Sequence, residues 1–152
     1  MGARQDQQLA ALAASLEEVV TSLQPAGLSG TAAVAALDLF ERVARLAEAG
    51  RLAVLPRIEQ TRAWHGQGHP TMAHWTAART GTTIGRAADT LNTAKALTGL
   101  PDTRAALAGG AISPHQTHEI ALAAGADPTF EHKLLSTAAE RTVSELRDEC
   151  RM

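Results

Sequence analysis

Apolar residues recur at intervals of three and four along most of this chain, and no segment alternates apolar and polar residues with a period of two. The three-and-four spacing places apolar side chains on one face of an α-helix, whereas a half-buried strand requires alternation. Ala and Leu are abundant, aromatic residues make up 3% of the chain, and Tyr is absent. Because Ala and Leu lose little entropy in a helix and strand-favouring residues are scarce, the sequence predicts an all-α fold.

The spacing predicts one long helix that packs with several short ones. A first stripe over residues 6–23 ends at a Pro–Gly turn, so we divide the chain into an N-terminal helix, 1–27, and a helical domain, 28–152. The long helix is expected over 31–64, with a kink or a break at Pro56, because proline removes a helical hydrogen bond. Shorter helices are expected over 72–79, 83–98, 103–108 and 114–124, with further helices beginning after Asp127 and Thr142.

Several of these helices begin at residues that can cap a helix. Ser113, Pro114 and Gln116 form the best local signal, because Ser caps the N-terminus, Pro fits the first helical position and Gln completes a capping box. The same reasoning predicts N-terminal caps at Thr71, Asp102, Asp127 and Thr142.

The apolar stripes also predict a core. The stripe of the long helix demands a partner surface, which the helices after residue 71 supply. Trp75 is the largest apolar side chain available to fill that contact. The residues expected to be buried there are Phe40, Val43, Trp75, Ile84 and Leu91.

Composition excludes several classes of protein. The chain has 152 residues, of which 45% are apolar and 20% are charged, a balance typical of one globular domain. Cys150 is the only cysteine, which excludes an internal disulfide framework and a cysteine-cluster zinc site. No apolar run approaches the roughly 20 residues needed to span a bilayer, and the N-terminus lacks a signal peptide. These observations predict a cytoplasmic location without membrane contact.

The charge distribution is more informative than the net charge of −2. Residues 61–115 contain five basic and two acidic side chains, whereas both flanking segments are net acidic. A mildly positive middle segment is compatible with a small phosphate-facing surface, and equally with an ordinary solvated face.

The turn at residues 79–83 joins two short helices through a connection that contains Gly81. Such helix-turn-helix hairpins can place their second helix in the major groove of DNA, although many hairpins only pack. Arg can bind guanine with two hydrogen bonds, and Thr can reach phosphates or a thymine methyl group. A second hairpin over 103–124 fits as well, with His115, Gln116 and Glu119 at the start of its second helix. The candidate DNA-binding residues are Arg79, Thr82, Thr83, Arg86, Thr90, Thr93 and Arg104.

Other chemistry finds little support in the sequence. His65, His69 and His74 lie close together, but their segment lacks the Asp, Glu or Cys that a zinc site commonly adds. His115 and His118 stand three apart at a helix start, and Ser113 is better explained as a cap than as a nucleophile. We therefore predict no metal site, no cofactor and no catalytic residues.

Residues 28–124 contain a series of short motifs in a characteristic order. They include Met72-Ala-His-Trp75, Leu100-Pro101 and Ile112-Ser113-Pro114-His115, together with the Ala/Leu-rich segment 31–63. In these motifs the chain resembles the actinobacterial domain of unknown function 222 family. Proteins of this family commonly carry the domain ahead of an HNH endonuclease domain and are often associated with mobile elements. The family supplies no catalytic residues of its own, so the resemblance implies context and not a reaction.

An HNH nuclease needs an Asn among metal-binding and catalytic histidines. The only Asn in this chain is Asn92, which lies in a predicted helix without a nearby His. The expected function is therefore a non-catalytic helical module that engages double-stranded DNA and accompanies a downstream HNH domain. The alternative is a helical domain that binds protein, including a second copy of itself as a homodimer.

Overall fold

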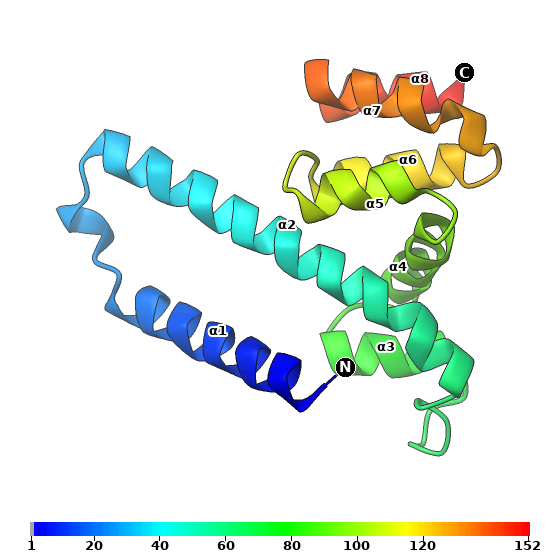
Figure 1. The fold of residues 1–152 in the computed structure, drawn as a ribbon, viewed down its shortest axis with the longest axis horizontal. Coiled ribbons are helices and arrows are strands. Elements are labelled where there is room, and N and C mark those ends of the chain that lie inside the picture. The colour runs from blue at the N-terminus through cyan, green and yellow to red at the C-terminus, as the bar shows by residue number, and fades with distance from the viewer. Residues whose placement is uncertain (1) are drawn as a thin grey trace. The chain divides into compact units, whose positions relative to one another are not determined.

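The computed structural model describes residues 2–152, and every regular element in this range is helical. The prediction of an all-α fold is confirmed. Figure 1 shows the eight α-helices, which are connected by turns, by a loop over residues 62–71 and by two 3₁₀ segments, Pro25–Gly27 and Pro128–Phe130. Their bounds are α1 Ala3–Ser22, α2 Gly30–Thr61, α3 Met72–Thr80, α4 Ile84–Leu97, α5 Pro101–Ala108, α6 Pro114–Ala124, α7 Glu131–Glu140 and α8 Val143–Arg151.

Contacts within the chain define two units, which meet inside α2 between Leu39 and Phe40. The sequence pattern places a boundary earlier, after residue 27, because the Pro25–Gly27 turn interrupts the apolar stripe there. The first unit contains α1 and the first turns of α2, and none of its described residues is buried. The earlier part of α2 therefore groups with α1, and the later part groups with the remaining helices.

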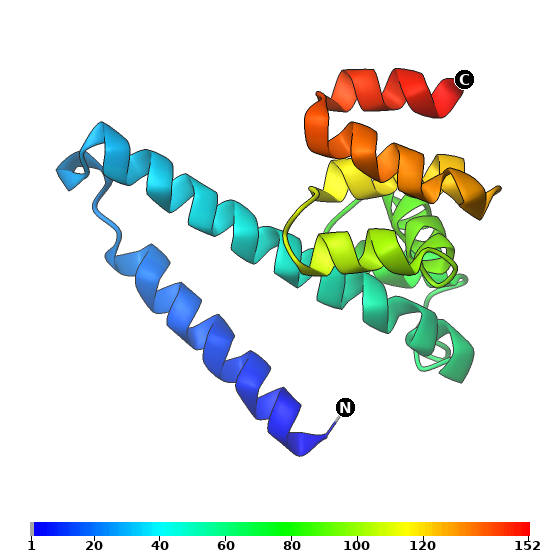
Figure 2. The ribbon, with the colours of Figure 1, turned by 45° about the horizontal axis from the view of Figure 1, so that its top comes forward.

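The second unit contains the hydrophobic core. The later part of α2 contributes Leu52 and Leu55, and each of the helices α3–α8 adds at least one buried residue. α3 packs against α4, and α6 packs against α4, α7 and α8. Figure 2 shows α7 and α8 side by side next to α6. The largest fully buried aliphatic side chains of this core are Leu100, Leu107, Ile120 and Leu146.

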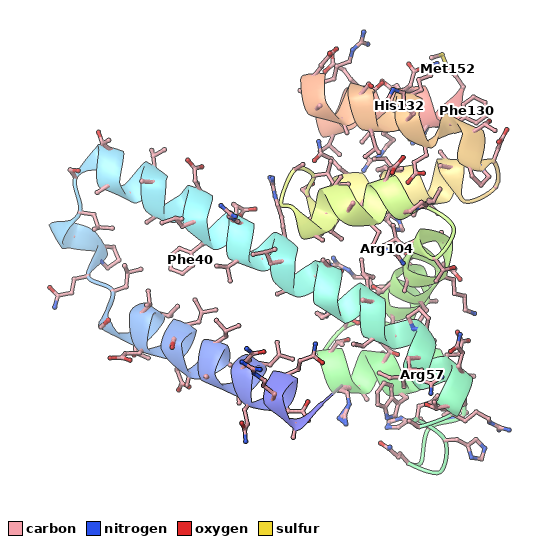
Figure 3. All side chains as sticks on the ribbon, viewed as in Figure 1. Phe40, Arg57, Arg104, Phe130, His132 and Met152 are labelled. Atoms are coloured by element: carbon pink, nitrogen blue, oxygen red, sulfur yellow. The ribbon has the colours of Figure 1, made fainter. Side chains whose placement is uncertain are left out.

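The predicted core is right at two positions and wrong at two others. Trp75 and Leu91 are buried, and Phe40 is half-buried on α2 (Figure 3). Val43 is exposed because the core reaches α2 only from Leu52 onward. Ile84 is 47% exposed because it is the first residue of α4, one turn before the packed face begins at Ala87.

α2 continues through Pro56 as one helix, so the break that was one of the two predicted outcomes does not occur. Proline removes one backbone hydrogen bond, and the buried side chains of Leu52 and Leu55 hold the preceding turn against the core. The helix ends at Thr61, before the predicted residue 64, with Arg62 in the left-handed conformation at φ 54°. The amide of Ala63 donates to the carbonyl of Ile58 at 3.2 Å, as in a common helix C-terminal motif.

Most of the predicted caps are confirmed. Thr71 accepts a hydrogen bond from the amide of His74, and Asp127 accepts one from the amide of Thr129. Both capping boxes are present, one between Ser113 and Gln116 and one between Thr142 and Glu145.

The cap predicted at Asp102 is wrong. α5 begins at Pro101, two residues before the predicted start at residue 103, so Asp102 lies inside the first turn and Leu100 occupies the N-cap position. The Oε1 atom of Glu131, at the start of α7, instead accepts a hydrogen bond from the amide of Thr103 at 2.6 Å. This acceptor comes from a residue 28 positions away, so the local sequence cannot reveal it.

Candidate functional site

The α3–α4 hairpin lies where the sequence predicts it. α3 ends at Thr80, and α4 begins at Ile84 after a three-residue turn. Gly81 caps α3 with a φ of 68°, a left-handed conformation that glycine adopts without a Cβ penalty. The amides of Gly81 and Thr82 both donate to the carbonyl of Ala77, which closes the turn tightly.

Arg79 is an exposed side chain that is held in place by an aromatic ring. Its guanidinium carbon lies 4.8 Å from the ring centre of Trp75, a cation–π contact. The indole of Trp75 is buried, and its Nε1 donates to Oε1 of Gln67 at 2.9 Å. Because the Arg79 side chain is exposed, its guanidinium donors remain accessible to a phosphate.

The first residues of α4 are also exposed. Thr83 is the N-cap of α4, and its hydroxyl accepts from the amide of Arg86 at 3.2 Å. The hydroxyls of Thr80 and Thr82 lie 3.2 Å apart. Thr82, Thr83 and Arg86 therefore present polar groups at the N-terminal end of α4, the part of a recognition helix that typically contacts base edges.

Thr90 and Thr93, further along α4, are placed differently. Thr93 is only 5% exposed, and its hydroxyl donates to the carbonyl of Asp89 at 2.9 Å. Thr90 is half-buried, and its hydroxyl donates to the carbonyl of Arg86. α4 packs against α6 as well as α3, so this end of the predicted DNA-facing surface is covered.

The hydroxyl of Thr93 also links α4 to α6. Its oxygen lies 2.8 Å from Nδ1 of His118, across the contact between these two helices.

A groove of about 280 Å³ connects the two hairpins that the sequence presents as alternatives. It lies between α2, α4 and α6, and the side chains of Arg86 and His118 contribute to its wall. Two carboxylates, Glu48 and Asp89, also line it, and Glu48 pairs with Arg51 at 2.6 Å. The remaining lining residues are Leu52, Thr90, Thr93, Pro114 and His115.

The charges of this groove are mixed, which limits what it can bind. Arg86 favours an anion, whereas Glu48 and Asp89 oppose one. Arg86 belongs to the hairpin around the turn at residues 79–83, and His118 belongs to the second hairpin, over 103–124. No local sequence pattern connects either residue with Glu48. Glu48 was for this reason missing from the candidate residues.

Arg104 lies apart from the other candidates. It is exposed on α5 (Figure 3) and lines a separate hollow between α2, α4 and α5, together with Pro56 and Thr98. Of the seven candidate residues, the structure therefore brings Arg86, Thr90 and Thr93 into one groove. Thr82 and Thr83 lie at the hairpin turn, Arg79 ends α3, and Arg104 belongs to another surface.

Metal-ligating and nucleophilic groups are dispersed. Among residues 2–152, no three His, Cys, Asp or Glu side chains come together as a metal site. Cys150 is half-buried, and its Sγ lies 3.5 Å from the carbonyl of Glu119. Burial, aided by the charges of Glu119 and Glu149, raises the pKa of the Cys150 thiol, so it stays protonated at neutral pH.

No protein-family model, curated protein or solved structure matches this chain. The resemblance to the domain of unknown function 222 family stays a hypothesis that rests on the quoted motifs. None of the helices in residues 2–152 combines the length and the apolar character that crossing a bilayer requires.

Proposed function

We propose that this chain is a non-catalytic helical module that engages double-stranded DNA through the α3–α4 hairpin. The observation that carries the proposal is the placement of Arg79 and Arg86 on either side of the three-residue turn, both exposed. Thr82 and Thr83 stand between them at the start of α4. This arrangement offers two cations for phosphates or guanine edges and two hydroxyls for phosphates.

The burial of Thr93 narrows the proposed contact to the N-terminal end of α4. A helix inserted by its N-terminal residues needs only its first turns free of other helices. We therefore keep Arg79, Thr82, Thr83 and Arg86 as the contact set and leave out Thr90 and Thr93, which pack toward α6. Arg104 lies on a different surface and would act, if at all, as a separate backbone contact.

We also propose that an HNH domain accompanies this chain in a longer protein. This part of the proposal rests only on the resemblance to the domain of unknown function 222 family. This chain carries a single Asn and no HNH motif, so cleavage would belong to another domain of a longer protein. The role left to the chain is binding, and the location we propose is the cytoplasm.

The test is a titration of fluorescent duplex DNA at low and moderate salt. We expect binding that weakens with salt, because contacts to phosphates release counterions. Arg86→Ala should weaken binding about tenfold, the loss of about 1.4 kcal/mol for one good contact. The melting temperature should stay unchanged, because Arg86 is exposed and forms no side-chain ion pair within the described residues.

Arg57→Ala is the matched control for this experiment. Arg57 is an exposed arginine on α2 outside the hairpin (Figure 3), so its removal changes the net charge equally. We expect it to leave duplex affinity nearly unchanged. Equal losses for Arg57→Ala and Arg86→Ala, or no duplex affinity of the unmodified chain at low salt, would contradict the proposal.

A helical interaction module is the second candidate function. The observation that favours it is the first unit, in which large apolar side chains remain exposed. Contiguous exposed apolar surface typically marks a protein–protein contact.

A further inference from the structure

The apolar residues of α1 follow the spacing of a coiled-coil seam. Leu9, Leu12, Leu16 and Val19 are separated by three, four and three residues, the alternation that defines positions a and d of a heptad repeat. Leu23, the C-cap residue that follows α1, continues this spacing in the sequence. Leu16 is half-buried, and Leu12 is 66% exposed. A seam of this kind fits against another helix that carries the same spacing.

The side chains of α1 also lack the burial against other elements that stabilises most helices in proteins. Among its 20 residues, Ala3–Ser22, none is buried. Most helical stability in proteins comes from packing an apolar face against another element rather than from intrinsic propensity. The conformation of α1 therefore calls for a partner surface.

The exposed apolar side chains are concentrated in this unit and continue into α2. Val34 and Leu37, on the first turns of α2, are exposed in the same way as the α1 residues. Nine of the exposed large apolar residues lie between Leu9 and Leu39, which distinguishes this region from singly scattered surface residues.

The flanks of the α1 seam indicate what the partner is. The positions beside the seam hold no charge, and Glu17 and Glu18 lie on the side of the helix away from it. In a coiled coil, charged residues beside the seam select a partner helix of opposite charge or reject one of like charge. Because the positions beside the α1 seam are uncharged, neither effect acts on its choice of partner. A second copy of this chain offers an equally uncharged, matching seam. The flanking residues are Gln8, Ala13, Ser15, Val20 and Ser22.

We propose that the occupant of this surface is a second copy of the chain, with α1 of one copy packed against α1 of the other through the Leu9–Leu23 seam. The residues involved lie outside the α3–α4 hairpin. The inference therefore does not rest on DNA binding, and either proposal can fail without the other.

The test is sedimentation equilibrium of the full chain across a wide concentration range. We expect a dimer for the unmodified chain and a monomer for Leu12→Glu, because a charge at a d position must be buried in the pair. Glu is a good helix former, so this change preserves the helical propensity of α1. The circular dichroism of the aromatic residues should stay unchanged, because Trp75 belongs to the second unit.

Leu122→Glu is the matched control, since Leu122 is 59% exposed on α6 in the second unit. It should remain a dimer. A monomeric unmodified chain at every concentration, or a Leu12→Glu variant that still dimerises, would overturn the proposal. Loss of the dimer in Leu122→Glu would also overturn it by placing the contact elsewhere.

A cross-link gives a second, independent readout. Leu16 is the central residue of the seam, so two copies approach each other there in either a parallel or an antiparallel pair. Leu16→Cys in a Cys150→Ser background should form a disulfide-linked dimer under mild oxidation, whereas Leu122→Cys in the same background should not. Failure of the Leu16→Cys chain to cross-link would argue against pairing through α1.

Discussion

Trp75 is held by three kinds of contact at once. Its ring is 7% exposed within the core, its Nε1 donates to Gln67, and Arg79 lies over its face. Replacing it with Ala removes a large buried side chain, and such cavities cost about 3–5 kcal/mol. We expect Trp75→Ala to lower the free energy of unfolding by this amount in urea denaturation followed by circular dichroism. An unchanged unfolding midpoint would mean that the ring does not belong to the core.

Trp75→Phe separates the contribution of the ring from that of its N–H group. Phenylalanine keeps an aromatic face for Arg79 but cannot donate to Gln67, so the loss should be clearly smaller than for Ala.

Among the helices, α5 depends on a cap from another element. The buried carboxylate of Glu131 accepts the hydrogen bond from the amide of Thr103 and is 8% exposed. Glu131→Ala leaves that buried amide unsatisfied, so we expect a loss of about 1–3 kcal/mol in the free energy of unfolding. Thermal and urea denaturation would measure it.

Two control variants distinguish this cap from a general effect of charge. Glu131→Gln keeps the Oε1 acceptor and should lose less stability than Glu131→Ala. Asp102→Ala removes an exposed carboxylate that does not cap α5, so its effect should stay within about 0.5 kcal/mol. A larger loss for Asp102→Ala than for Glu131→Ala would restore the cap that the sequence predicts.

The difference between local and distant contacts also decides how much the sequence could predict. The caps at Ser113 and Thr142 are local, because each partner lies three residues away, and both were predicted correctly. The Glu131–Thr103 contact spans 28 residues and left no local pattern. The groove was missed for the same reason, since Glu48, Arg86 and His118 meet only through helix packing.

The apolar stripe of α4 gave a partly correct core. Helical spacing identified Leu91 as an inward residue, but it placed Ile84 on the same buried face. Spacing shows which residues share a face, whereas the position of the neighbouring helix decides where along that face burial begins. The seam of α1 shows the same limit, because its spacing predicts a helix and an apolar face but not what packs against that face.

At the scale of the whole molecule, the two units should contribute differently to stability. Every buried residue of the described chain lies at or after Leu52, in the second unit. We therefore expect a chain lacking residues 1–39 to keep its melting temperature within a few degrees. The same deletion should abolish dimer formation, measured by sedimentation.

A longer deletion through residue 61 serves as the comparison. It removes Leu52 and Leu55 from the core, and each buried Leu contributes about 1.5–3 kcal/mol. This shorter chain should melt at a much lower temperature. A large loss of stability from the 1–39 deletion would instead show that the first unit supports the core.

Because Glu131 follows α5 in the sequence, α5 is synthesised before the residue that caps it. α5 is only eight residues long, and such a short helix does not persist alone in water. Its buried acceptor is added 28 residues after Thr103, a delay of about one to six seconds at ordinary rates of translation. Until Glu131 has been added, the amide of Thr103 lacks the acceptor that it has in the folded chain, and α5 lacks this cap.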